Sequence, residues 1–127
     1  MTTATIRPTT LRRTFTQDEL DAFGHASGGT GHIHTDPEFA AATPFGRTLV
    51  QGLFLLAVVE RAIETALPDP AVGWAELRVI FVAPVGVGDE FRVEVAPGDA
   101  PGLVRVEAFA GSTTALVGTA TTREETS

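Results

Sequence analysis

The chain has 127 residues, 43% of them hydrophobic, which suits one compact domain with a modest core. Its formal net charge is −7 and its nine basic residues are all arginines scattered along the sequence, which excludes the basic stripe that nucleic-acid binding requires. Cysteine is absent, which excludes disulfides, thiolate chemistry and cysteine metal ligands.

The two ends of the chain are mostly polar. Residues 1–10 lack the apolar core of a secretion signal, and we expect residues 1–8 and 123–127 to be loose. The longest apolar run, residues 53–59, is far too short to span a bilayer. We therefore expect a cytoplasmic protein without a membrane partner.

The first predicted elements are a strand over residues 9–16 and a helix directly after it. Thr16 and Glu19 have the three-residue spacing of a capping box, in which each residue satisfies a free backbone N–H group of the other. Gly24 marks the predicted end of this helix.

Residues 27–52 hold the candidate chemistry of the chain. Three glycines within residues 27–31 predict a loop that allows close backbone approach. Asp36 can cap a short helix over residues 36–42, because its carboxylate can accept from a free N–H group of the first turn. His34 is therefore expected at the mouth of an ordered element.

Residues 52–66 predict a long helix. Its first two turns are apolar on every side and charge first appears at Glu60, a pattern typical of a buried helix. Gly52 at its start leaves free backbone N–H groups at the positive end of the helix dipole, which suits a developing negative charge. A simple helix cap is the alternative for this glycine.

The rest of the chain predicts strands, because apolar residues alternate with polar ones. Turn residues separate the predicted strands, so we expect consecutive strands to pair as an antiparallel meander. A buried helix against such a sheet is an α+β arrangement. The strands are centred on residues 77–81, 91–95, 104–108 and 113–122, and the turns on residues 84–89, 97–102 and 111–112.

Three segments resemble the MaoC-like hydratase/dehydratase family, which includes (R)-specific enoyl-CoA hydratases and has the hotdog fold. They are residues 27–41, the following FGRTLVQG, and LRVIFVAPVGVGDEF after the long helix. The resemblance implies a single hotdog domain over residues 1–127, with a five-stranded antiparallel sheet wrapped around a buried central helix. It also implies a dimer whose sheets join edge to edge, and no cofactor.

The signature loop of that family reads approximately S-G-D-x-N-P-(I/L)-H-x-D. Carried over by position, the catalytic histidine falls on His34 and the oxyanion-hole glycine on Gly52, whereas the catalytic aspartate position is Gly29. The asparagine and proline positions are Gly31 and His32. The substrate-binding residues we expect are Gly29, Gly31, Phe45 and Gln51.

His32 is the nearest candidate to replace the missing carboxylate, since imidazoles titrate near the pH of acid/base catalysis. Alternatively, His32 has only a structural role: it occupies the position of the family's proline and donates a hydrogen bond to a loop carbonyl. His25 lies near the end of a predicted helix, where its side chain can donate a hydrogen bond to one of the last free carbonyl groups. Because the three histidines lack the spacing of zinc motifs, no metal site is expected.

The resemblance implies a hydratase or dehydratase acting at the β-position of an acyl thioester on CoA or an acyl-carrier protein. Gly29 has no group that accepts a proton, so an atypical substrate or mechanism is expected. A partner subunit could instead supply the carboxylate. The alternatives are a non-catalytic hotdog subunit or acyl-binding protein that pairs with an active homologue, and a hotdog thioesterase.

Overall fold

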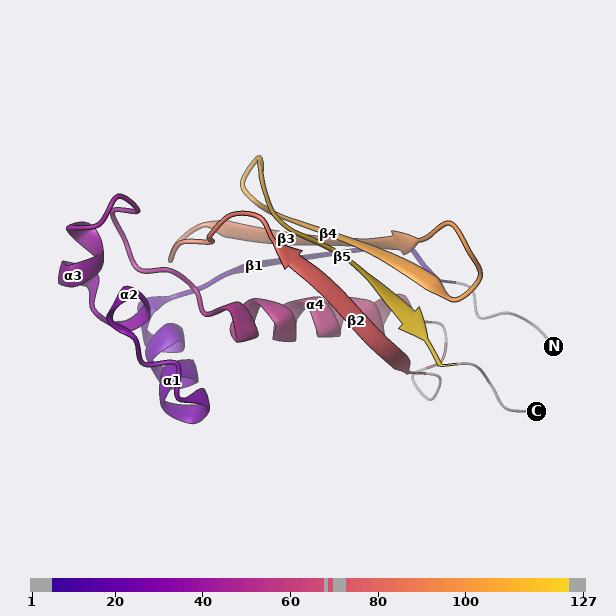
Figure 1. Ribbon diagram of the computed structural model, residues 1–127, viewed down its shortest axis with the longest axis horizontal. Coiled ribbons are helices and arrows are strands. Elements are labelled where there is room, and N and C mark those ends of the chain that lie inside the picture. The colour runs from indigo at the N-terminus through magenta and orange to yellow at the C-terminus, as the bar shows by residue number, and fades with distance from the viewer. Residues whose placement is uncertain (1–5, 68, 70–72, 124–127) are drawn as a thin grey trace.

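The computed structural model describes residues 6–67, 69 and 73–123. A five-stranded antiparallel sheet and the long helix α4 form two layers, and three shorter helices lie beyond one end of the sheet (Figure 1). The elements in chain order are β1 (Thr9–Thr14), α1 (Gln17–Ser27), α2 (His32–Thr35), α3 (Pro37–Ala41), α4 (Gly52–Ala66), β2 (Trp74–Phe81), β3 (Glu90–Pro97), β4 (Leu103–Ala110) and β5 (Thr113–Thr122).

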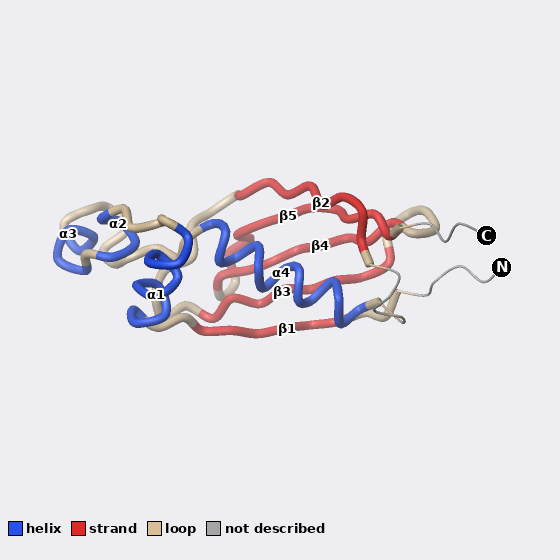
Figure 2. The backbone as a smooth tube through the Cα atoms, turned by 90° about the horizontal axis from the view of Figure 1, so that it is seen from below, coloured by secondary structure: helices blue, strands red, loops and turns tan. Residues whose placement is uncertain are grey.

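The strand order is β1-β3-β4-β5-β2, which Figure 2 shows from the side of α4. The predicted meander is confirmed for β3, β4 and β5, but β2 pairs with β5 at the far edge, so the predicted pairing of β2 with β3 is wrong. The connecting residues 82–89 do not form a hairpin. Val85 is buried there, and its carbonyl accepts from Val50 N at 2.8 Å, which ties the connection to the chain before α4.

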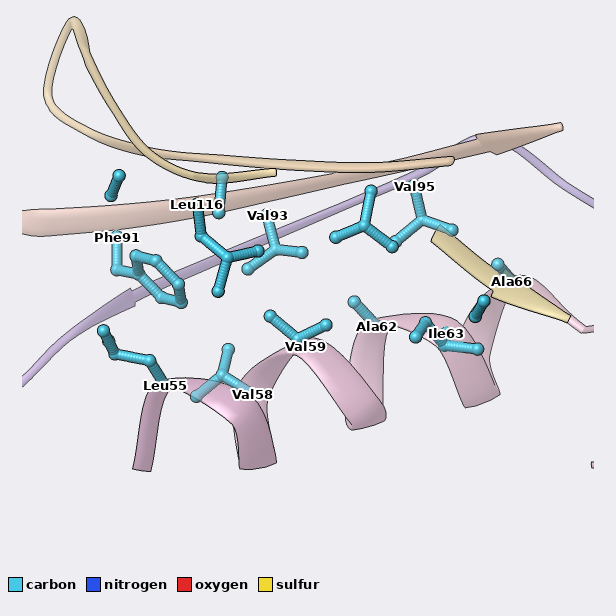
Figure 3. Close-up of a cluster of buried hydrophobic side chains, with 14 of the residues drawn as sticks. Leu55, Val58, Val59, Ala62, Ile63, Ala66, Phe91, Val93, Val95 and Leu116 are labelled. Carbon is cyan, nitrogen blue, oxygen red and sulfur yellow. The ribbon is translucent and has the colours of Figure 1, made fainter. Parts of the chain in front are cut away.

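Helix α4 lies across one face of the sheet, which is not closed around it. Its inward residues pack on sheet residues that include Phe91 and Val93 (Figure 3). The outward face is open, and Leu53 is 64% exposed. The prediction of a helix buried on all sides is therefore wrong for the single chain, because the sheet covers one side only. The buried helix residues are Leu55, Val58, Val59, Ala62, Ile63 and Ala66.

The N-terminal elements begin and end close to their predicted positions. The capping box of Thr16 and Glu19 is confirmed, and α1 continues to Ser27 before Gly28 ends it with a φ of 83°. Ile6, which was expected to be loose, is buried in the core, and Arg7 N donates to Ala66 O at 2.9 Å. Most residues of the expected loose ends, 1–5 and 124–127, lie outside the described residues.

Candidate active site

His34 lies on α2, a single helical turn where sequence analysis predicted no element. Gly31 is the residue before this turn, and its carbonyl accepts from His34 N at 2.9 Å and from Thr35 N at 3.2 Å. Asp36 ends α2 and caps α3, because its carboxylate accepts from Phe39 N at 3.1 Å; this confirms the predicted cap. His34 therefore lies in a turn whose start at Gly31 and end at Asp36 are both fixed by hydrogen bonds.

The imidazole of His34 is half-buried and oriented by the main chain. Its Nδ1 atom lies 2.7 Å from Leu49 O. A carbonyl oxygen only accepts, so Nδ1 carries a proton and donates it to this bond. In the neutral ring the other nitrogen, Nε2, keeps its lone pair and can accept a proton. An imidazole held in this way can serve as a general base.

His34 and Gly52 line one cavity of about 320 Å³. Gly52 is the first residue of α4, and Gln51 before it makes no side-chain capping bond. The positive end of a 15-residue helix therefore lies at the wall of the cavity that the imidazole also lines. The other lining residues are Leu49, Val50, Leu55, Phe81, Val82, Ala83, Pro84 and Val85.

A polar clamp connects α1, α2 and the chain before α4. Gln17 Nε2 donates to His34 O at 2.9 Å, and Gln17 Oε1 accepts from Thr48 Oγ1 at 2.6 Å. Thr48 is buried, and the next residue, Leu49, donates from its N atom to Ile33 O at 2.9 Å. The roles of Gln17 and Thr48 could not be predicted, because no local sequence pattern distinguishes them from ordinary helix-start and loop residues.

Gln51 forms a second polar connection instead of reaching the cavity lining. Its Nε2 atom donates to Leu20 O at 2.8 Å and to Gly29 O at 3.2 Å. A Cβ atom at Gly29 would lie 3.3 Å from Gln51 Cγ, so the position to which the resemblance assigns the catalytic carboxylate borders the side chain of Gln51. The amide of Gln51 therefore fixes the glycine loop against the start of α4.

The remaining predicted site residues lie at different distances from the imidazole. Gly31 is adjacent, since a Cβ atom there would lie 3.8 Å from His34 Cδ2. His32 is exposed and its ring meets the ring of Phe39 edge-on, with 5.4 Å between centroids. Phe45 is 52% exposed. Neither His32 nor Phe45 lines the cavity that holds His34, and their roles stay predictions.

The described part of the chain contains neither a cluster of metal-ligating side chains nor a membrane-spanning helix. Among residues 6–67, 69 and 73–123, no three metal-ligating side chains lie close enough together to hold a metal ion. No helix within the same residues has both the length and the apolar character needed to cross a membrane.

A long helix laid on one face of an antiparallel sheet with this strand order defines a hotdog domain. Within that class, residues 2–117 match the family model described as MaoC like domain, and the chain belongs to this family. The solved structure of the (R)-hydratase from A. caviae involved in PHA biosynthesis is 28% identical, with a TM-score of 0.81 over 95% of this chain and 96% of that one.

Two curated relatives are also similar in sequence. The 3-hydroxybutyryl-CoA dehydratase of Methylorubrum extorquens is 33% identical over 68% of this chain and 56% of its own length. The 3-hydroxyacyl-thioester dehydratase Z of Mycobacterium tuberculosis is 39% identical over 62% of this chain and 55% of its own length. The matched region is thus about half the length of these relatives.

Proposed function

We propose that this chain removes water from, or adds water to, the β-position of an acyl thioester carried on CoA or an acyl-carrier protein. Membership of the MaoC-like family and the dehydratase names of its relatives support the reaction class. The observation that carries the proposal is the shared cavity of His34 and the Gly52 end of α4.

In the dehydration direction, the Nε2 atom of His34 takes the proton from the α-carbon of a 3-hydroxyacyl thioester. The electron pair moves onto the thioester oxygen, where the Gly52 N–H and the helix dipole stabilise the charge. The enolate then expels the β-hydroxyl, which leaves as water with the proton that His34 returns. Hydration is the reverse, and one imidazole suffices when both proton transfers use the same face of the substrate.

The glycine at position 29 restricts the substrates for which this mechanism is efficient. Gly29 supplies no second acid or base, so all proton transfer depends on His34. We expect the enzyme to favour substrates whose α-carbon is already acidic over simple enoyl thioesters.

The test compares His34→Ala with the wild type on crotonyl-CoA and 3-hydroxybutyryl-CoA, following the absorbance of the enoyl thioester. We expect the variant to lose activity by about 10²–10⁴-fold, the contribution of a positioned acid/base group. His25→Ala, which changes an exposed histidine on α1, is the matched control. Equal rates for His34→Ala and wild type would remove His34 from the mechanism.

We further propose a homodimer joined through the edge strand β2. Ile80, Phe81 and Val82 at this edge are 68%, 49% and 56% exposed, and exposed apolar edges favour pairing with another strand. Phe81 and Val82 also line the cavity, so the partner would lie near the site. Ile80→Lys should convert the dimer to a monomer in light scattering, whereas Thr10→Lys on the opposite edge should not.

A non-catalytic subunit that pairs with an active homologue is the second candidate function. The missing carboxylate at Gly29 favours it, because the partner could supply the complete site. Purified chain that forms a homodimer and turns over a thioester would exclude it. Release of free thiol without a change in the enoyl absorbance would indicate a thioesterase instead.

A further inference from the structure

The carboxylate of Asp89 connects two segments that border the cavity of His34. Its Oδ1 atom lies 2.7 Å from Arg47 Nη2, and its Oδ2 atom accepts from Gly86 N at 2.9 Å. Arg47 belongs to the chain before α4, and Gly86 to the connection between β2 and β3. The side chain of Asp89 is only 21% exposed, and both of its oxygens are engaged. This one side chain therefore fixes the two segments against each other.

The same two segments hold the peptide unit that orients the imidazole. Val50 N donates to Val85 O at 2.8 Å, beside the antiparallel bridge between Leu49 and Gly86. The N–H group of Val50 and the C=O group of Leu49 belong to one planar peptide unit, in which they point in opposite directions. The carbonyl therefore points at His34 Nδ1, 2.7 Å away, while the N–H group points at Val85. The position of the Val85 carbonyl thus sets the direction of the carbonyl that holds the ring.

Arg47 reaches Asp89 by passing directly over Gly86. A Cβ atom at Gly86 would lie 2.8 Å from Arg47 Cζ, which is too close for van der Waals contact. Gly86 does not have the positive φ that favours glycine, so its backbone would accept a side chain. The guanidinium, and not the turn, is therefore what excludes a side chain at this position. The ion pair depends on this close approach.

We propose that Asp89 is a positioning residue for His34. By fixing the connection between β2 and β3, it keeps the Leu49 carbonyl in place as the acceptor for Nδ1–H. The bond at Nδ1 decides that the neutral ring has its lone pair on Nε2. Without it the ring can turn, and it takes the proton on Nε2, the form that neutral histidine favours in water. An Nε2 atom that carries a proton cannot remove one from the substrate. The inference rests on the proposed function, in which Nε2 is the base.

Three variants weaken the connection in different ways. Asp89→Ala removes both contacts of the carboxylate, whereas Asp89→Asn keeps an oxygen acceptor for Gly86 N and loses the ion pair. Gly86→Ala keeps both charged residues, but its Cβ atom displaces the guanidinium of Arg47. We expect kcat to fall about tenfold in Asp89→Ala and less in the other two, with a smaller change in KM. Glu94→Gln breaks the exposed ion pair with Arg92 on the outer face of β3, and as the matched control it should keep the kcat of the wild type.

Nitrogen NMR of the imidazoles gives a readout that needs no turnover and that an ion pair acting on stability alone would not change. The nitrogen shifts show which ring atom carries the proton. The chain has three histidines, so comparison with His34→Ala assigns the signals of His34. At a pH where the ring is neutral, we expect Nδ1–H in the wild type and in Glu94→Gln. The share of Nε2–H should rise in Asp89→Asn and further in Asp89→Ala, while the exposed His25 stays unchanged as the internal reference.

The outcomes separate this inference from the proposed function. A His34 proton that stays on Nδ1 in every folded variant would overturn the inference, even if kcat falls. A wild type with the proton on Nε2 would overturn it as well. If neither variant of Asp89 folds, Gly86→Ala decides by the same measurement. Failure of the wild type to turn over any thioester would instead refute the proposed function, and the NMR comparison would still decide whether Asp89 positions the ring.

Discussion

The two-layer part of the molecule and the helical segment beside it are stabilised differently. The sheet and the inner face of α4 are held by buried apolar side chains such as Val59, Phe91 and Leu116 (Figure 3). The segment with α1, α2 and α3 lies beyond the end of the sheet (Figure 1). Only Leu20 of this segment belongs to the core cluster, and side-chain hydrogen bonds from Gln17 and Gln51 add polar connections to the chain before α4. Substitutions in the first part should change stability, and those in the second should change activity.

The largest expected effect is on the core. Phe91 is fully buried beneath α4, and its ring centroid lies 6.2 Å from that of Phe15. Phe91→Ala should lower the free energy of unfolding by about 3–5 kcal/mol, because it removes apolar burial and leaves a cavity. Chemical denaturation measures the change. Phe109→Ala, on the half-exposed outer face of β4, is the control and should cost far less; similar losses would contradict this account of the core.

The next effect should appear in activity with little change in stability. Gly52→Pro deletes the proposed oxyanion donor, yet proline is favoured at the first position of a helix. Gln51 before it has φ −60° and ψ 138°, which a following proline accepts. We expect kcat to fall by about 10²–10³-fold while the melting temperature changes little.

Gly52→Ala is the control for that experiment, because it keeps the N–H group. Its added Cβ atom would meet Phe81 Cζ at 3.4 Å, an ordinary contact. If Gly52→Pro keeps the kcat of Gly52→Ala, the amide of residue 52 does not bind the thioester oxygen.

A change in the polar clamp of Gln17 and Thr48 should lower both stability and activity, each by less than the preceding variants do. Gln17→Leu removes the donor to His34 O and the acceptor for Thr48, so it should lower the free energy of unfolding by about 1–3 kcal/mol. It should also reduce kcat about tenfold, since α2 then holds His34 less firmly. Gln17→Glu keeps the acceptor for Thr48 and should lose less stability. An unchanged kcat in Gln17→Leu would show that the clamp does not position the imidazole.

The difference between the two regions also explains which features could be predicted from the sequence. Alternating apolar residues predicted β3, β4 and β5, because burial on one face leaves a period of two. The same alternation could not assign a neighbour to β2, since it shows which face is buried and not which strand lies alongside. Val85 within this turn-rich segment is buried, but its burial follows from contacts that the local sequence does not show.

Two candidate site residues could be singled out because each lies at the start of a predicted helix and matches a position of the resembled family. These are His34 and Gly52, and the structure places both at one cavity, while their catalytic roles stay predictions. The bonds that hold them join residues distant in sequence, such as Gln17 with Thr48 and Gln51 with Leu20, each pair 31 positions apart. Composition and periodicity carry no signal for such a pair, because a single glutamine fits equally well on a solvated surface.

The smallest expected effect concerns the charge at the start of α1, where the two regions meet. The backbone N–H of Thr16, and next the guanidinium of Arg13, hold the pKa of the Glu19 carboxyl below its usual value. A lowered pKa in the folded state means that the carboxylate stabilises the fold at pH values above its unfolded pKa, and that this contribution is lost as the pH falls through the folded pKa. Glu19→Gln keeps a capping-box side chain and removes the charge. At neutral pH the wild type should be more stable by no more than about 1 kcal/mol, as expected for an exposed ion pair, and the two urea midpoints should converge in acid. A difference that stays constant from neutral to acidic pH would show that the charge of Glu19 does not contribute.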